Sequence, residues 1–338
     1  MSHFAGLPVT PPDAAFSLVA AFAADDFPEK VDLCPGFYRD EEANPWILPS
    51  VAKAKQLIHD DPTTDHEHLP LSGHPELIAN ARDLVFGSGK EKHARIASIQ
   101  TVSGTGSNHL GARFLSDELA PPKKRVWISD PSWINHTEIW LNVNPGIERR
   151  IYPYYARDTQ SLDFEGMKRT LLRDAAAGDV VILHGCAHNP TGLDLTREQW
   201  EIIAYICEEK DLFPFFDLAY PPAFGARIVA KIFGDQVLYQ QWQDDLHQMS
   251  RRMKQMRQRL YEELKKRETP GSWEHILVEI GMFSITGLSP AQVKVLKEEY
   301  HVYLLPSGRI SVTGLTEANV AYVAEAFDKV LRSTESKE

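Results

Sequence analysis

The sequence predicts an α/β protein, with a large domain built on a mostly parallel sheet and a smaller α+β domain. Between residues 90 and 220, short β-rich runs alternate with longer amphipathic stretches. This alternation is typical of a parallel sheet covered by helices on both faces. After residue 220 the pattern becomes mainly helical, with two short β-like segments. We expect the large domain to span 44–245, and the small domain to combine 1–43 with 246–338.

The alternation also gives an order of elements. The expected strands of the large domain are 96–102, 125–129, 148–155, 179–185 and 212–217. The expected helices are 14–24, 105–119, 135–143, 163–175, one beginning after Thr196, and most of 223–267. The β-like segments of the small domain are 282–286 and 302–312. Ligands of parallel α/β sheets bind beyond the carboxyl ends of the strands, so the residues that follow each strand are the first candidates for a site.

Composition limits the classes of partner. The chain has 338 residues, 25% of them charged, and a formal net charge of -11, which argues against nucleic acid or an anionic membrane as the main partner. The three cysteines form neither a disulfide framework nor a paired metal spacing, which favours a reducing compartment. No apolar run is long enough to span a bilayer. We therefore expect a cytoplasmic protein.

The run SGTGS follows the first expected strand and opens a helix. Backbone amides at a helix start, with small residues around them, suit a phosphate; a tight strand-to-helix turn is the plainer interpretation. A second hypothesis is dinucleotide binding by Gly104, Gly106 and Gly111, with Asp130 as the ribose-binding acid. The glycine spacing misses G-x-G-x-x-G by two residues.

Two further motifs follow expected strands. PSWINH places Trp133 beyond a strand end, where it packs in the core or stacks on a ligand. HGCAHNPTG contains His184 and His188, four residues apart, which is a metal-ligand spacing on a helix. Here the first histidine ends a strand and the second precedes a turn, so we expect no metal. Asn189 in that turn can offer its amide to a ligand.

Asp217 follows the apolar run FPFF. A partly desolvated carboxylate needs a cationic or hydrogen-bonding partner to stay charged; a helix N-cap or a structural ion pair is the alternative. Near the end of the chain, Arg309 begins a β-like segment, where it pairs with an internal acid or clamps a carboxylate at two points. Taken together, these residues suit a flat phosphorylated heteroaromatic cofactor and an amino-acid substrate.

The order of motifs resembles that of the aspartate aminotransferases, which are pyridoxal-phosphate (PLP) enzymes of fold type I. The resemblance runs over nearly the whole chain, through LCPGFYRDEEANPWILPSV, SGTGS, SDPSWINH, HGCAHNPTGLDLT, PFFDLAY, PPAFGARIVA, GMFSITGL and YLLPSGRISVTGL. HNPTG followed by FFDLAY, with SGRI near the end, is highly specific in combination. The resemblance implies an aspartate transaminase that transfers an amino group from L-aspartate to 2-oxoglutarate.

The resemblance also implies roles for matching positions. The cofactor phosphate would be bound by Ser103, Gly104 and Thr105. Trp133 would stack on the cofactor ring, and Asn189 and Tyr220 would hydrogen-bond its phenolic oxygen. Asp217 would pair with the pyridine nitrogen and keep it protonated.

On the substrate side, the resemblance implies that Arg309 clamps the α-carboxylate and that the backbone of Gly36, with Trp133 and Asn189, contacts the substrate. The substrates would be a small amino acid and a 2-oxo acid. The family is homodimeric, with active sites at the subunit interface. His68 stands where the family usually has a tyrosine that reaches the phosphate of the neighbouring subunit; a histidine can still donate there.

One departure from the family is severe. Tyr220 is followed directly by Pro221, where the family has several dozen further residues with a strand and the Schiff-base lysine. The six lysines between Asp217 and Arg309 read as solvated helix residues: Lys231, Lys254, Lys265, Lys266, Lys294 and Lys297. No catalytic residue is identified, and any PLP would bind non-covalently. We expect a large domain shortened by about one βα unit, and the alternative function is a lysine-less chain that at most binds PLP or a partner subunit.

Overall fold

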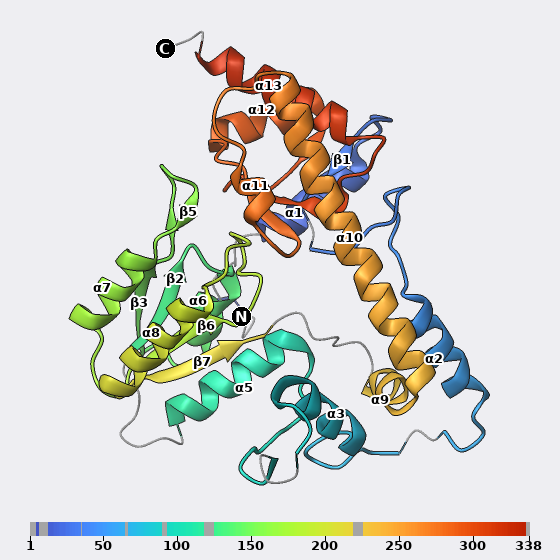
Figure 1. Ribbon diagram of the computed structural model, residues 1–338, viewed down its shortest axis with the longest axis vertical. Helices are drawn as coiled ribbons and strands as arrows, with labels where there is room; N and C mark the ends of the chain where they lie inside the picture. Colours follow the sequence, from blue (N-terminus) through green and yellow to red (C-terminus); the bar gives the residue numbers. More distant parts are fainter. Residues whose placement is uncertain are drawn as a thin grey trace. The chain divides into compact units, whose positions relative to one another are not determined.

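The computed structural model describes residues 5–6, 13–34, 36–64, 67–89, 93–117, 125–218 and 226–335. These residues form two compact units (Figure 1). The large unit comprises 46–189 and 193–251, and the small unit comprises 1–45, 190–192 and 252–338. The domain division that we expect from the sequence, with a large domain at 44–245, stays a prediction.

The large unit contains a four-stranded parallel sheet in the order β3-β2-β6-β7. Its strands are β2 (Arg125–Asp130), β3 (Glu148–Pro153), β6 (Val180–His184) and β7 (Phe213–Asp217). The α/β class with a parallel sheet is therefore confirmed. The register pairs His184 with Asp217, so the last residues of β6 and β7 lie side by side at the carboxyl edge of the sheet.

Side chains alternate between the two faces of this sheet, as strand geometry requires. Val181 and Leu183 belong to one buried cluster, and Val180 and Ile182 belong to another. The helices that pack with these clusters are α5 (Ser103–Asp117), α6 (Ile134–Val143), α7 (Phe164–Asp174) and α8 (Arg197–Glu209). Thr196 caps α8 in a reciprocal capping box with Gln199, which confirms the N-cap expected from the sequence.

The strand that we expect at 96–102 is absent: the described residues there are irregular up to the start of α5 at Ser103. Among the described residues, β7 is the last strand on its side of the sheet. No described strand lies beside 96–102 to pair with it, and a β-rich run without a partner does not form a stable strand. The prediction is wrong for that reason.

Three more helices complete the large unit. Figure 1 shows α2 (Pro49–Asp60), α3 (Pro75–Phe86) and α9 (Ala226–Gly234), together with the 31-residue helix α10 (Gln236–Lys266), whose second half belongs to the small unit. Ala54 of α2, Ile232 of α9 and Trp242 of α10 form a separate buried cluster. A short hairpin joins β4 (Tyr155–Ala156) to β5 (Ser161–Leu162).

The small unit combines short strands with helices, as expected of an α+β domain. β8 (Phe283–Ile285) pairs antiparallel with β10 (Arg309–Ser311), and β1 (Val31–Asp32) pairs parallel with β9 (Val302–Tyr303). Its other elements are α1 (Ala14–Ala24), α11 (His275–Val278), α12 (Pro290–Tyr300), the 3-10 turn η1 (Val312–Gly314) and α13 (Val320–Glu335). Within the described ranges, no helix has the length and apolarity needed to cross a bilayer.

Candidate active site

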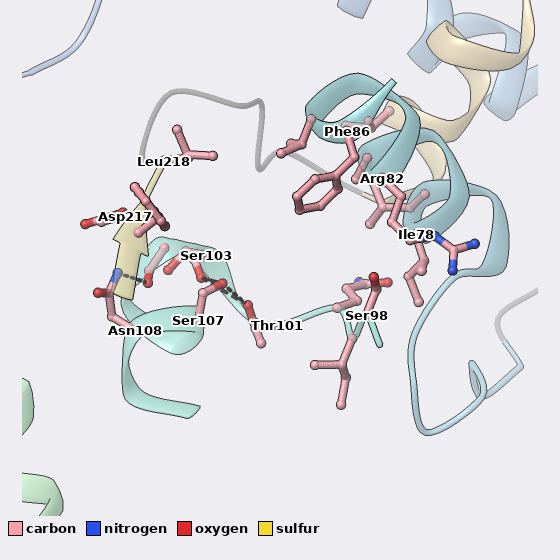
Figure 2. Close-up of a pocket in the computed structure, with 18 of the residues that line it drawn as sticks. Ile78, Arg82, Phe86, Ser98, Thr101, Ser103, Ser107, Asn108, Asp217 and Leu218 are labelled. Carbon is pink, nitrogen blue, oxygen red and sulfur yellow. Dashed lines mark hydrogen bonds between the residues drawn. The ribbon is translucent and has the colours of Figure 1, made fainter. Parts of the chain in front are cut away.

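A cavity of about 490 Å³ opens in the large unit between the end of β7, the start of α5 and helix α3. Its lining includes Ser103, Gly104, Ser107, Asn108 and Asp217. Figure 2 shows Asp217 at the end of its strand above Asn108, with the serines of α5 beside them. The fold thus brings the expected phosphate-binding turn and the expected acid, which are more than one hundred residues apart in sequence, into one cavity.

Asp217 is held by a histidine that the sequence analysis did not single out. His136 Nε2 lies 2.8 Å from Asp217 Oδ2, and the two side chains are only 0% and 9% exposed. Burial by itself raises the pKa of the Asp217 carboxyl, but the hydrogen bond from His136 and the neighbouring His136 and His184 rings outweigh it, so that the pKa is lowered. Asp217 is therefore an ionised acceptor at neutral pH.

The direction of each proton in this network follows from the backbone. The Asn189 N–H donates to His184 Nδ1 (3.3 Å), so a neutral His184 carries its proton on Nε2. His184 Nε2 then donates to Ser132 Oγ (3.2 Å), and the Ser132 hydroxyl donates to His136 Nδ1 (3.0 Å). This leaves the His136 proton on Nε2, where it donates to Asp217. The turn after β6 thus sets the protonation pattern around the acid.

Both histidines of the HGCAH run are neutral; His188 is buried and His184 is half-buried. Burial, with the neighbouring His136 ring, lowers the pKa of His184 to about 3, and burial next to His184 lowers the pKa of His188 well below its usual value. His188 Nε2 lies 2.9 Å from Ser129 Oγ, and its ring stacks on Tyr154 at 3.8 Å between centroids. Serine partners therefore occupy the Nε2 atoms of both rings, and among the described residues no group suited to hold a metal ion is found.

The HNPTG turn is held by a carboxylate on its far side. Asp194 accepts from the amides of Ala187 (2.9 Å) and His188 (3.1 Å), which stabilises a positive φ of 48° at Ala187. Gly192 also has a positive φ, and a Cβ there would meet the Ile280 and Phe283 carbonyl oxygens at 2.8 Å. The turn therefore requires glycine at this position.

The SGTGS run forms the first turn of α5, which is 15 residues long. The Ser107 hydroxyl donates to the Ser103 carbonyl (3.2 Å), and a Cβ at Gly104 would meet no atom within 4 Å. Open space in front of amides that have no helical partner suits an anion. Thr105 is exposed and does not line the cavity.

The remaining expected cofactor residues have different positions. Trp133 packs edge-on against His136, with 5.2 Å between the ring centroids. Because His136 is hydrogen-bonded to Asp217, one side chain separates Trp133 from the acid. Asn189 is tied to the same network through its backbone amide. His68 belongs to the large unit but does not line the cavity. Tyr220 lies outside the described residues.

The two expected substrate residues of the small unit meet at one aromatic ring. Arg309 stacks over Phe283 at 4.2 Å, and its Nη2 donates to the Cys34 carbonyl (2.9 Å). A Cβ at Gly36 would come within 2.6 Å of the Phe283 ring. Phe283 thus positions the guanidinium plane and leaves room only for glycine at 36.

Four contributors escaped the sequence analysis: Ser132, His136, Asn108 and Asp194. A signal existed for His136, because Ser132 and His136 are one helical turn apart directly after a strand. The Asp194 partnership depends on the path of a turn and has no comparable signal.

Comparison with known proteins decides the family. The sequence profile described as "Aminotransferase class I and II" matches residues 28–222 and 221–327. The chain belongs to this aminotransferase family. It is 36% identical to the cytoplasmic aspartate aminotransferase of Saccharomyces cerevisiae, over 97% of each chain. It is 38% identical to an L-tyrosine:2-oxoglutarate aminotransferase of Aspergillus ustus, over 94% of this chain and 76% of the relative.

Solved structures of aminotransferases agree with the fold. The cytoplasmic aspartate aminotransferase of S. cerevisiae superposes with a TM-score of 0.92 at 35% identity, covering 98% of this chain and 99% of the other. An aromatic-amino-acid aminotransferase of Burkholderia pseudomallei, covalently bound to pyridoxal phosphate, superposes with a TM-score of 0.90 at 29% identity, covering 98% and 100%. The fold expected from the resemblance is confirmed. The cofactor of this aminotransferase family member is pyridoxal phosphate.

The comparisons also locate a difference in length. The alignment with the S. cerevisiae enzyme runs over 410 positions, whereas this chain has 338 residues, so at least 72 positions have no counterpart here. The family profile matches in two stretches that meet at 221–222. Residue 221 is the proline that follows Tyr220 directly.

The dinucleotide hypothesis finds no support. The matched family is that of aminotransferases, not of dinucleotide-dependent oxidoreductases. Gly111, the third glycine of the loose pattern, lies inside α5, where a Cβ would come within 2.5 Å of Phe215. This glycine therefore allows α5 to pack closely on β7 and has no place in a phosphate loop.

Proposed function

We propose that this chain is an aspartate aminotransferase by descent, built to transfer the amino group of L-aspartate to 2-oxoglutarate with pyridoxal phosphate. Relatives named for aspartate match it at 33–36% identity over nearly its full length, and they carry the description cytoplasmic. We extend that location, and a homodimeric state, to this chain. Because the described residues that line its site include no lysine, we also propose that it binds the cofactor non-covalently and turns over slowly.

The pair formed by Asp217 and His136 carries the proposal. A buried carboxylate with one hydrogen bond from an imidazole retains acceptor capacity for a cation at its other lone pairs. A pyridinium nitrogen is a cation of the right shape for this position. Bound pyridoxal phosphate supplies an electron-withdrawing ring, which makes the substrate α-proton easier to remove.

Other residues of the chain have supporting roles. The first turn of α5, from Ser103 to Ser107, would hold the cofactor phosphate with its amides and hydroxyls. Trp133 would cover one face of the ring. Asn189 would offer its side-chain amide to the ring oxygen while its backbone sets the tautomer of His184. Arg309, held against Phe283, would bind the substrate α-carboxylate as a two-point clamp.

We expect slow transamination because no described lysine amine lies beside the cofactor site. Among the described residues, no lysine lines the cavity that contains Asp217. Lys231 on α9 is exposed and lies close enough to Asp61 to lower the pKa of that carboxyl, after the larger effect of Thr63. A transaminase needs a base beside the α-carbon to move the proton, and the described chain supplies none there.

Cofactor binding tests the proposal directly. The purified chain is titrated with pyridoxal phosphate and with pyridoxamine phosphate, followed by absorbance and equilibrium dialysis, and compared with Asp217→Asn. We expect saturable binding that Asp217→Asn weakens by about 10- to 100-fold, because the variant loses a buried charge pair. Asp130→Asn is the matched control: this exposed acid ends β2, which β6 separates from β7, and the change should leave affinity unchanged.

Two results would count against the proposal. Absence of binding, or equal affinity in Asp217→Asn, would remove the assigned site. Borohydride treatment that fixes the cofactor on one lysine, located by peptide mapping, would show that the chain does possess the amine. Aspartate–2-oxoglutarate transaminase activity is measured in parallel and is expected near background.

A further inference from the structure

The small unit contains a buried ion pair to which the proposed function gives no role. Arg257 on α10 and Glu279 lie 3.1 Å apart, between Nη1 and Oε2, and their side chains are only 4% and 0% exposed. The cost of removing two charges from water can exceed the gain from their mutual attraction. What the pair contributes therefore depends on the groups that its remaining hydrogen bonds hold in place.

The guanidinium of Arg257 binds four acceptors on the segment that runs from α11 into β8. Nη1 donates to the Ile276 carbonyl (3.2 Å) as well as to Glu279. Nη2 donates to the carbonyls of Gly281 (3.2 Å) and Phe283 (2.7 Å). The planar fork of an arginine holds its acceptors in fixed directions, which the compact ammonium of a lysine does not. Arg257 therefore fixes the backbone that leads into β8.

Phe283, one of these acceptors, lies under the guanidinium of Arg309. The ring centroid is 4.2 Å from the guanidinium carbon, and the two residues belong to the paired strands β8 and β10. Because a side chain occupies discrete rotamers on its backbone, fixing the backbone at Phe283 also limits the direction of its ring. A continuous series of contacts thus leads from Arg257 through Phe283 to Arg309.

We propose that Arg257, with Glu279 beside it, is a positioning residue for the carboxylate clamp at Arg309. It holds Phe283 under the Arg309 guanidinium, so that the two-point clamp is oriented before a carboxylate binds. This inference rests on the proposed role of Arg309 in binding the substrate α-carboxylate. Arg257 acts through Phe283 and does not contact the substrate.

Glu279 contributes as a hydrogen-bond acceptor more than as a charge. Burial raises the pKa of its carboxyl to about 7, although Ser284 and Arg257 both lower it. A carboxyl that is partly protonated at neutral pH still accepts a hydrogen bond from Nη1 of Arg257. Glutamine offers an acceptor of the same shape without the charge. Glu279→Gln should therefore preserve the positioning of Arg309, whereas Glu279→Ala should not.

Two measurements on the intact chain test the proposal. Protons above an aromatic face are shifted upfield in NMR spectra, so the side-chain resonances of Arg309, assigned by their loss in Arg309→Lys, report whether the Phe283 ring lies beneath them. Calorimetric titration with succinate, in the presence of pyridoxal phosphate, gives the affinity for an unreactive dicarboxylate. In Arg257→Lys we expect the upfield shift to be largely lost and the Kd to rise by about tenfold or more, because a bidentate contact is no longer oriented in advance.

A matched control lies on the same helix. Arg259 is 40% exposed and pairs with Glu262 and Glu317, which are outside the segment that Arg257 holds. Arg259→Lys makes the same chemical change and should leave both the upfield shift and the Kd at the values of the parent chain. Urea denaturation of each variant measures stability separately. A purely structural role of Arg257 would lower stability and leave the Arg309 resonances and the Kd of the folded protein unchanged.

The Glu279 variants keep the proposal testable if Arg257→Lys does not fold. Glu279→Ala removes one of the four acceptors, and we expect the Kd for succinate to rise by about threefold. Glu279→Gln should restore the Kd and the upfield shift of the parent chain. Equal values for the parent, Glu279→Ala and Glu279→Gln would overturn the part assigned to Glu279.

Two further outcomes would count against the inference, and they are distinguishable. A folded Arg257→Lys protein with the upfield shift and Kd of the parent would show that Phe283 needs no such support, whatever Arg309 binds. A Kd that does not respond to Arg309→Lys would overturn the proposed role of Arg309 as a clamp, and the inference with it. The NMR readout requires neither cofactor nor succinate, so it separates the first outcome from the second.

Discussion

β6 and β7 are adjacent parallel strands of similar hydrophobicity, yet one is buried and the other is not. Val180, Val181, Ile182 and Leu183 are at most 2% exposed, whereas Phe213 and Phe216 are 37% and 54% exposed. β6 has a strand on each side, and β7 has a described neighbour on one side only. Burial in a sheet thus depends on the neighbouring strands more than on the residues of the strand itself.

The comparison separates two regions of the large unit. The β6 side has two buried clusters, the helices packed with them and the histidine network. The β7 side keeps the acid that completes the site but lacks a covering layer among the described residues. Experiments that perturb one strand and spare the other separate the two regions.

The largest effect is expected for Ile182→Ala in β6. This side chain is completely buried between α5 and α6, so truncation removes buried apolar surface and leaves a cavity. We expect the free energy of unfolding to fall by about 2–5 kcal/mol, measured by urea denaturation followed by circular dichroism. A loss below about 1 kcal/mol would mean that the β6 side is as loosely packed as the β7 side.

Acidification should be the next largest effect, because a half-buried and a buried histidine, both neutral, lie at and just after the carboxyl end of β6. The folded pKa values of His184 and His188 are lowered, so below the unfolded pKa of about 6.5 only the unfolded chain binds these protons. Stability therefore falls as pH falls through this range. We expect a loss of about 2.5 kcal/mol between pH 7 and pH 5.5 for the two residues. Urea midpoints across this range measure it, and His188→Gln should halve the slope.

Ser132→Ala tests the bridge between the two strands. Its hydroxyl joins His184 on β6 to His136, which holds Asp217 on β7. Removing it leaves two buried ring nitrogens without this partner, and we expect a loss of about 1–2 kcal/mol. NMR of the imidazole nitrogens should show a mixture of His136 tautomers in the variant. A single unchanged tautomer would contradict the assigned proton order.

The smallest effect is expected for Phe216→Ala on the open face of β7. Because the ring is more than half exposed, truncation should change the free energy of unfolding by no more than about 0.5 kcal/mol. The same urea experiment compares it with Ile182→Ala. A loss of 2 kcal/mol or more would show that the ring is covered in solution.

Much of this fold was predictable because its signals are local. The buried runs at 125–129, 179–185 and 212–217, the capping residue Thr196 and the alternation with helices all indicated the parallel sheet. The run at 96–102 has the same local signal and still forms no strand, because strand formation needs a partner that lies elsewhere in the sequence. Local pattern cannot report whether that partner is present.

The site was predictable in part for a related reason. Asp217 and the SGTGS turn stood out because each follows an expected strand, and the structure places them in one cavity. His136 was missed because its role depends on contact with a residue 81 positions away. The assigned roles in cofactor and substrate binding stay predictions until the titrations are done.

The backbone amide of Asn189 has a consequence for how this network tolerates change. Since an N–H group is common to every residue except proline, the proton order that ends at Asp217 does not depend on which side chain occupies position 189. A substitution there can abolish any contact of the side chain with a ligand while the acid keeps its hydrogen bond. At position 189 the side chain therefore serves ligand recognition and the backbone N–H serves the orientation of the acid. Only a substitution by proline would remove both at once.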